Sequence, residues 1–202
     1  MKDTYKSISK ASEEVLFKDK NSKFFGYAFP ITSEEEAKVH IEELKKKHHQ
    51  ARHWCYAWQI GKEVHQFRAN DDGEPSNTAG MPIYGQIQSF DVTNILIVVV
   101  RHYGGIKLGV SGLINAYKTT AQMALENSKI VKRTIDEVFV IKFDYPEMNL
   151  VMRVIKEHNL KLIEQKLELN CEIHISVRKK IAKEIFQKFE AIYKVEIKNL
   201  KD

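Results

Sequence analysis

Residues suited to acid–base or metal chemistry concentrate in one stretch of the chain, "RANDDGEPSNTAGMP" from Arg68 to Pro82. Its three carboxylates, on Asp71, Asp72 and Glu74, could act as a general base or bind a cation. Glycine and proline interrupt both helix and strand here, and Asp-Gly favours a turn, so a loop is predicted. The interrupting residues are Gly73, Pro75, Gly80 and Pro82. Three interpretations compete: a flexible linker, a metal or catalytic loop, and a shaped binding loop.

A second stretch, "GGIKLGVSG" from Gly104 to Gly112, could bind an anion. Its glycines permit left-handed backbone, and the free N–H groups at the start of a following helix would attract negative charge. Arg101 and Lys107 would add positive charge, and Ser111 a hydroxyl group. The stretch matches neither GxxxxGK[ST] nor GxGxxG. A tight turn that brings the helix close to a sheet would explain the same glycines.

Two other kinds of chemistry have weaker support. A metal site could use His53, Cys55 and His65, or the three loop carboxylates, but further ligands do not follow at a recognised spacing. A nucleophile could be Cys55 or Ser76 with a histidine such as His102 as base, but no GxSxG elbow is present. We therefore expect neither a metal nor another cofactor.

Aromatic residues alternate along one predicted strand, where Trp54, Tyr56 and Trp58 share a face. Such a face could stack the bases of RNA. The same residues could equally form part of a hydrophobic core, and this second interpretation is favoured.

Charge and composition indicate the class of partner. The 202-residue chain has a net charge of +5, and the excess is concentrated between residues 89 and 133. This segment has two acids, Asp91 and Glu126, against six basic residues: Arg101, Lys107, Lys118, Lys129, Lys132 and Arg133. A local excess of this kind favours phosphate or RNA. No apolar run reaches the length of a membrane span, no signal peptide is evident and the two cysteines form no CxxC pattern. A cytoplasmic protein without a membrane partner is expected.

Hydrophobic patterning places these stretches in a fold. Ser33 and Glu36 form a capping box that begins a helix reaching about His49. The remaining elements expected before residue 134 are strands over residues 23–31, 52–60, 63–67 and 94–100, and helices over 83–89 and 109–127. From Thr134 onward the order is βαββαβ, as in a ferredoxin-like unit. The prediction is an α+β protein with two domains, residues 1–134 and 135–202.

The two glycine-containing stretches together resemble a known signature. "DDGEPSNTAGMP", followed at this distance by "VVVRHYGGIKLGVSGL", is similar to the YigZ/IMPACT family, and the resemblance covers most of residues 20–130. Asn77 stands where glycine is usual in the family, Met81 where a basic residue is common, and Trp54 where histidine is common. These departures weaken a phosphate role for the loop and a metal role for the strand.

The resemblance implies a specific architecture and role. The N-terminal domain would have the βαβ fold of the second domain of a small-subunit ribosomal protein, and the ferredoxin-like domain would be similar to the last domain of elongation factor G. Eukaryotic relatives act in translational control, where they bind the scaffold that activates a starvation-responsive kinase. The implied partner is therefore RNA, the ribosome or a translation-associated protein.

The main hypothesis is a non-enzymatic cytoplasmic binding protein that acts on translation through the loop and the glycine stretch. The alternative is an enzyme that handles a phosphorylated or peptide substrate in a pocket between the same segments, with the loop acids as base or metal ligands. The candidate binding residues are Asp71, Asp72, Gly73, Glu74, Pro75, Thr78, Gly80, Arg101, Gly104, Gly105, Lys107, Gly109 and Ser111.

Overall fold

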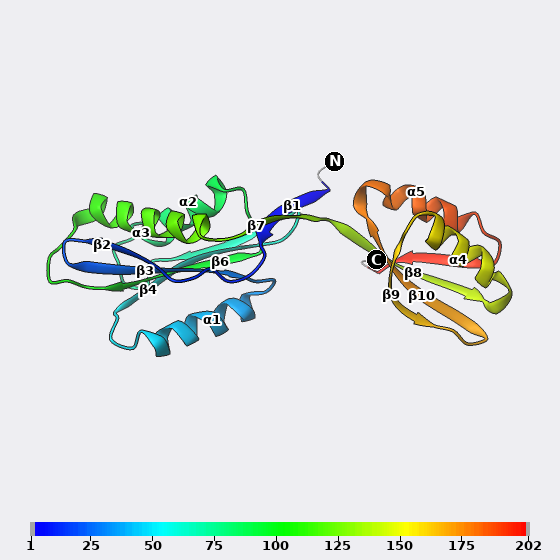
Figure 1. Ribbon diagram of the computed structural model, residues 1–202, viewed down its shortest axis with the longest axis horizontal. Helices are drawn as coiled ribbons and strands as arrows, with labels where there is room; N and C mark the ends of the chain where they lie inside the picture. Colours follow the sequence, from blue (N-terminus) through cyan, green and yellow to red (C-terminus); the bar gives the residue numbers. More distant parts are fainter. Residues whose placement is uncertain (1–2, 201–202) are drawn as a thin grey trace. The chain divides into compact units, whose positions relative to one another are not determined.

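The structure is a computed structural model that describes residues 3–200 (Figure 1). The chain divides into two compact units: Tyr5–Arg133, and the residues from Thr134 onward together with Asp3 and Thr4. Both units mix helices and strands, which confirms the predicted α+β class. Among the described residues, no helix combines the length and the apolar character needed to cross a membrane.

The N-terminal unit is built on a five-stranded antiparallel sheet in the order β2-β3-β6-β4-β5. Its strands are β2 (Val15–Asp19), β3 (Ser22–Pro30), β4 (His53–Ile60), β5 (Gln66–Asn70) and β6 (Ile95–His102). The central strand β6 pairs with both β3 and β4, so the βαβ unit β3-α1-β4 is split by β6. A separate two-stranded sheet pairs β1 (Thr4–Ile8) with β7 (Ile130–Thr134).

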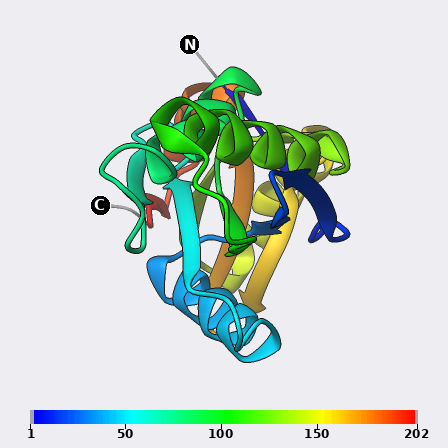
Figure 2. The ribbon, with the colours of Figure 1, turned by 90° about the vertical axis from the view of Figure 1, so that its left-hand side faces the viewer.

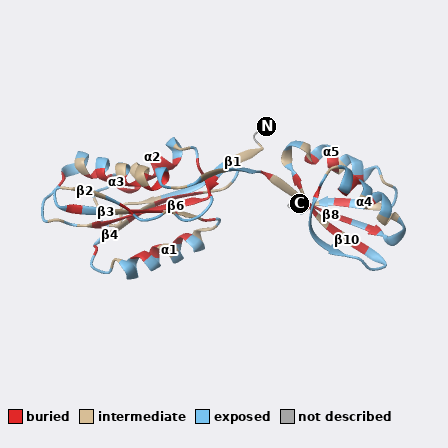
Figure 3. Cartoon of the chain, viewed as in Figure 1, coloured by how far each residue is buried: buried red, intermediate tan, exposed pale blue. Residues whose placement is uncertain are grey.

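Helices cover both faces of the five-stranded sheet (Figures 1 and 2). One face carries α1 (Glu34–Lys47), and the other carries α2 (Gly80–Ser89) and α3 (Gly109–Glu126). Every residue of β6 from Ile95 to Arg101 is therefore buried, as its continuous red colour in Figure 3 shows. The predicted aromatic face, with Trp58 6% exposed, packs with α1 in the core on that side, which confirms the core interpretation.

The predicted helix boundaries differ from the observed ones in two places. The capping box is present, since Ser33 Oγ accepts a hydrogen bond from the Glu36 N–H, but α1 ends at Lys47 rather than near His49. The predicted loop 68–82 is shorter than expected, because β5 continues to Asn70 and α2 begins at Gly80. Pro82 lies in the first turn of α2, where helix N–H groups have no intrahelical partner and a proline is tolerated.

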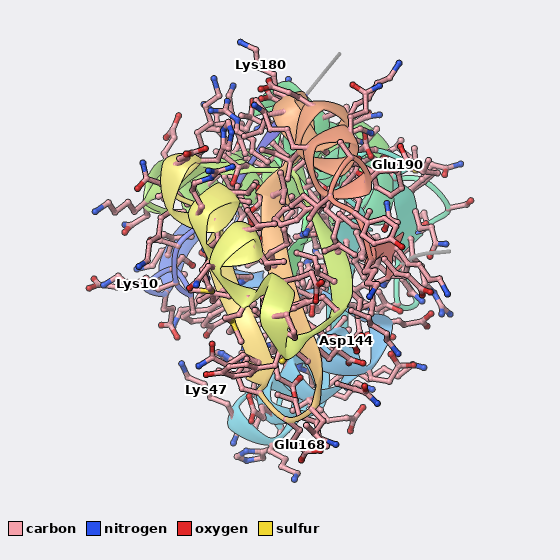
Figure 4. All side chains as sticks on the ribbon, turned by 90° about the vertical axis from the view of Figure 1, so that its right-hand side faces the viewer. Lys10, Lys47, Asp144, Glu168, Lys180 and Glu190 are labelled. Carbon is pink, nitrogen blue, oxygen red and sulfur yellow. The ribbon has the colours of Figure 1, made fainter. Side chains whose placement is uncertain are left out.

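The C-terminal unit has a four-stranded antiparallel sheet in the order β11-β8-β10-β9. Its elements follow one another as β8 (Asp136–Asp144), α4 (Met148–Glu157), β9 (Lys161–Lys166), β10 (Asn170–Arg178), α5 (Lys179–Glu190) and β11 (Val195–Asn199), with a 3-10 turn at Tyr145–Glu147. This order confirms the ferredoxin-like βαββαβ prediction. Lys180 and Glu190, at the two ends of α5, lie at the periphery (Figure 4).

Candidate functional site

Asp71 organises the loop that joins β5 to α2. Its Oδ1 accepts hydrogen bonds from the backbone N–H groups of Ala79 at 2.9 Å and Gly80 at 2.8 Å, and its Oδ2 accepts one from Asn77 at 2.8 Å. The carboxylate thereby caps the start of α2 from an earlier position in the chain, and a negative charge is favourable at a helix N-terminus. This cap explains why α2 begins at Gly80.

Asp72 attaches the loop to β4. Its Oδ2 accepts a hydrogen bond from the Trp54 N–H at 2.7 Å, and its carbonyl oxygen lies 2.8 Å from His53 Nδ1. Because a carbonyl oxygen only accepts, Nδ1 is the protonated nitrogen of His53. The backbone at Asp72, Gly73 and Asn77 is left-handed, with φ of 41°, 85° and 62°. Asparagine tolerates this conformation, so the loop keeps its shape without a glycine at position 77.

Glu74 fastens the loop to the end of β6 and to α3. Its Oε1 accepts hydrogen bonds from Arg101 Nη1 at 2.7 Å and from the Tyr117 hydroxyl at 2.8 Å. The Glu74 and Arg101 side chains are only 4% and 6% exposed, and the Arg101 guanidinium also lies 5.3 Å from the Tyr103 ring centroid. Burial raises the pKa of Tyr117, so its phenol remains a hydrogen-bond donor. The three side chains form a buried polar junction under the loop.

The glycine turn between β6 and α3 is shaped by close backbone contacts. A Cβ added to Gly104 would lie 2.1 Å from the backbone carbonyl carbon of Asn21, so only glycine fits. The Gly104 N–H donates to Ser22 Oγ at 3.2 Å. Gly105 and Gly109 have φ of +87° and +78°, which glycine adopts without strain. These contacts account for the glycines as turn formers.

A cavity of about 510 Å³ opens between the loop and the glycine turn. The loop contributes Glu74 and Pro75, and Leu108 and Leu113 of α3 and the segment before it contribute apolar surface. The full lining is Arg52, His53, Glu74, Pro75, Arg101, Tyr103, Lys107, Leu108, Gly109, Val110 and Leu113. Its volume falls within the range of roughly 300–1,000 Å³ typical of ligand sites.

A larger hollow of about 700 Å³ lies in the C-terminal unit. Several of the charged side chains around it pair with each other, as Lys142 does with Glu172 and Lys166 with Glu168. These side chains are between 37% and 67% exposed. Because such exposed ion pairs remain hydrated, the hollow lacks the buried polar groups that orient a ligand, and the N-terminal cavity is the better candidate site.

All but one of the predicted site residues fall into two groups. Those that line the cavity are Glu74, Pro75, Arg101, Lys107 and Gly109. Those that shape the surrounding backbone without lining it are Asp71, Asp72, Gly73, Thr78, Gly80, Gly104 and Gly105. Ser111 is exposed on α3 and does not line the cavity.

Arg101 requires a correction to the charge argument. The sequence interpretation counted it among the cations available to an anionic partner, but its side chain is buried and paired with Glu74. Its positive charge is therefore balanced within the protein. Lys107 remains exposed at the cavity, and the structure adds Arg52, an exposed cation that the sequence interpretation missed.

Nucleophilic and metal chemistry receive no support from the geometry. The Cys55 Sγ lies 3.0 Å from the Asp71 carbonyl oxygen, and burial raises the pKa of the Cys55 thiol, which keeps it protonated and unreactive. Within residues 3–200, no group of three or more histidine, cysteine, aspartate and glutamate side chains has an arrangement that could hold a metal ion.

Known proteins that are similar to this chain place it in a family. The Impact N-terminal domain family matches residues 20–125, more than half of the chain. The IMPACT family member YvyE of Bacillus subtilis is 33% identical over 88% of this chain and 81% of its own length. The IMPACT family member YigZ of Escherichia coli is 32% identical over 77% and 78%. A crystal structure described only as that of a hypothetical protein superposes with a TM-score of 0.75 and 25% identity, covering 98% of this chain and 97% of the other. This chain is therefore a member of the IMPACT family.

Proposed function

We propose that this chain is a non-enzymatic cytoplasmic regulatory protein linked to translation, and that it binds its partner at the cavity between the loop and the glycine turn. The link to translation is the expectation that accompanies the family resemblance. The place of binding rests on one observation: the buried Glu74–Arg101 pair holds together two walls of a cavity that is open to solvent.

The hydrogen bonds that the loop acids already make within the protein favour binding over catalysis. The Asp71 carboxylate accepts three backbone hydrogen bonds, Asp72 accepts one from β4, and Glu74 is bonded to Arg101 and Tyr117. An enzyme that used these acids as a general base or as metal ligands would have to break the contacts that shape its own loop. The acids therefore serve to hold the cavity wall in place.

Affinity capture tests the proposal. The tagged chain is incubated with a lysate of the cells from which it comes, with and without RNase, and recovered RNA and proteins are sequenced and identified by mass spectrometry. The cavity variant is Arg52→Glu/Lys107→Glu, in which both replaced side chains are exposed, so that the substitutions remove no core packing. The matched control is Lys180→Glu/Lys183→Glu, which reverses the same number of exposed charges on α5.

The expected result is recovery of ribosomal RNA, transfer RNA or a translation-associated protein by the wild type and the control, with loss in the cavity variant. RNase separates the partner classes, because recovery that resists RNase identifies a protein. Recovery that is equal in all three proteins would reject the cavity as the contact site. Recovery of neither RNA nor a translation-associated protein would reject the function.

A further inference from the structure

Large apolar side chains are exposed beside the cavity. Tyr103, Ile106, Val110 and Ile114 are 49%, 48%, 60% and 37% exposed, and all lie on the glycine turn or the first turns of α3. Val110 and Ile114 are four residues apart and so share one face of the helix. Scattered exposed apolar residues are normal, but a group of them adjoining a concave surface is typical of an interaction site.

The cavity beneath this group has an aliphatic lining. Leu108 and Leu113 are 7% and 6% exposed, and Pro75 and Val110 complete the apolar surface. The lining has two aromatic rings: that of Tyr103 already has the Arg101 guanidinium 5.3 Å from its centroid, and that of His53 is held by a hydrogen bond from its Nδ1 to the Asp72 carbonyl oxygen. Sites for single-stranded RNA instead provide aromatic faces on which bases stack. The lining therefore suits aliphatic side chains better than nucleobases.

The charge at the cavity is positive. Arg52 and Lys107 are exposed, and neither forms an ion pair with another described residue. The only carboxylate in the lining, that of Glu74, is neutralised by Arg101. Two cations beside the aliphatic side chains of the lining complement a ligand that combines aliphatic groups with carboxylates.

We infer that the cavity binds a short acidic and aliphatic segment of a partner protein, with an aliphatic side chain against Leu108, Val110 and Leu113 and an Asp or Glu carboxylate facing Arg52 and Lys107. The inference rests on the proposed function and specifies the partner's chemistry at the same site. The exposed Val110 and Ile114 extend the contact along α3 beyond the cavity.

Selection from a peptide library displayed on phage tests this inference with the purified full-length chain. Random peptides are selected on the wild type and counter-selected on Arg52→Glu/Lys107→Glu. Enriched peptides are expected to carry Asp or Glu next to Leu, Ile, Val or Met. A labelled enriched peptide is expected to lose roughly tenfold or more in affinity when the two cations are reversed, as measured by fluorescence anisotropy. A tenfold loss corresponds to about 1.4 kcal/mol of binding free energy.

Two further variants separate the apolar and the charged contributions. Val110→Ser is expected to lower the affinity for the peptide without changing how that affinity depends on salt. The substitution removes an apolar contact but no charge. Lys180→Glu/Lys183→Glu is expected to bind the peptide like the wild type. The absence of enrichment, enrichment of basic peptides, or equal binding to the charge-reversed cavity variant would each overturn the inference.

The two tests fail in different ways. If lysate capture depends on the cavity but is abolished by RNase, and the library yields no acidic peptides, the proposed function stands and the peptide inference falls. If acidic peptides bind the cavity while lysate capture recovers no translation component, the peptide site stands and the link to translation falls.

Discussion

Glu74 and Arg101, 27 residues apart in sequence, form an ion pair that is almost completely buried, with Glu74 Oε1 2.7 Å from Arg101 Nη1. Tyr117 donates a second hydrogen bond to the same carboxylate oxygen. Two charges removed from water are tolerated only where such additional contacts compensate for lost hydration. The pair therefore joins the loop to β6, and its integrity sets the shape of the cavity.

Removing one partner of this pair is expected to destabilise the protein strongly. Glu74→Gln or Arg101→Met leaves a buried charge uncompensated, at a cost of about 3–5 kcal/mol in the free energy of unfolding. The double variant Glu74→Gln/Arg101→Met should lose less than the sum of the single losses. Urea denaturation of all four proteins gives the coupling energy. Strictly additive losses would show that the two charges do not depend on each other.

The Asp71 cap is expected to stabilise the start of α2. Asp71→Ala leaves the N–H groups of Asn77, Ala79 and Gly80 without their acceptor, and should cost about 2 kcal/mol. Asp71→Asn keeps one acceptor oxygen and should cost less. Hydrogen exchange at Ala79 and Gly80 should accelerate in Asp71→Ala. Unchanged protection of these two amides would contradict the capping role.

Two glycine substitutions are expected to have opposite effects. Gly104→Ala places a Cβ 2.1 Å from the Asn21 carbonyl carbon, which forces the backbone apart, and should lower the melting temperature substantially. Gly85 lies within α2 with nothing within 4 Å of an added Cβ. Gly85→Ala should therefore be neutral or stabilise by up to about 1 kcal/mol through helix propensity. Equal thermal shifts in the two variants would argue against the tight backbone contact at Gly104.

Most elements of both units could be predicted because their signals are local, although the short strands β1, β2 and β7 were missed. The βαββαβ order, the apolar run of β6 and the capping box at Ser33 each depend on residues close together in sequence. The helix α2 begins earlier than predicted because Asp71 caps Ala79 and Gly80 across an intervening loop, and β5 continues to Asn70 because it pairs with β4. Hydrophobic periodicity contains no information on such a contact, so the predicted loop was too long.

The sequence indicated which segments line the cavity but not the charges that they expose. The glycines indicated correctly that loop and turn have demanding backbone geometry. A count of cations could not distinguish Arg101 from Lys107, because the burial of Arg101 depends on Glu74 in a distant segment. Arg52 was missed because it is distant in sequence from the glycine turn. The hydrogen bond between Asp72 and Trp54 of β4 attaches the loop beside it, and Arg52 thereby lines the cavity.

A chain of hydrogen bonds on the α1 side of the sheet predicts a dependence of stability on pH. The Tyr27 hydroxyl donates to Glu14 and so accepts from His48 Nε2 at 2.6 Å. Burial lowers the pKa of His48 and so favours the neutral ring, in which Nδ1 lacks a proton and accepts from His102 Nε2 at 3.1 Å. Lys47 completes the chain by donating to the same Glu14 oxygen at 2.8 Å. This arrangement requires His48 to be neutral, because its Nδ1 is an acceptor.

Acidification is therefore expected to destabilise the N-terminal unit. Burial lowers the pKa of His48 and of His102 below the ordinary value of 6.5, and the nearby positive charges of Lys47 and Lys23 lower them further. The unfolded chain thus binds more protons than the folded one below about pH 6.5, and stability falls as the pH decreases through that range. Urea denaturation at pH 7.5 and 5.5 should show a smaller pH-dependent loss for His48→Gln/His102→Gln than for the wild type. Hydrogen bonds from Lys47 and Tyr27 lower the pKa of Glu14 despite its burial, so its own contribution appears only at more acidic pH. An identical loss in both proteins would show that the histidine pair does not sense pH.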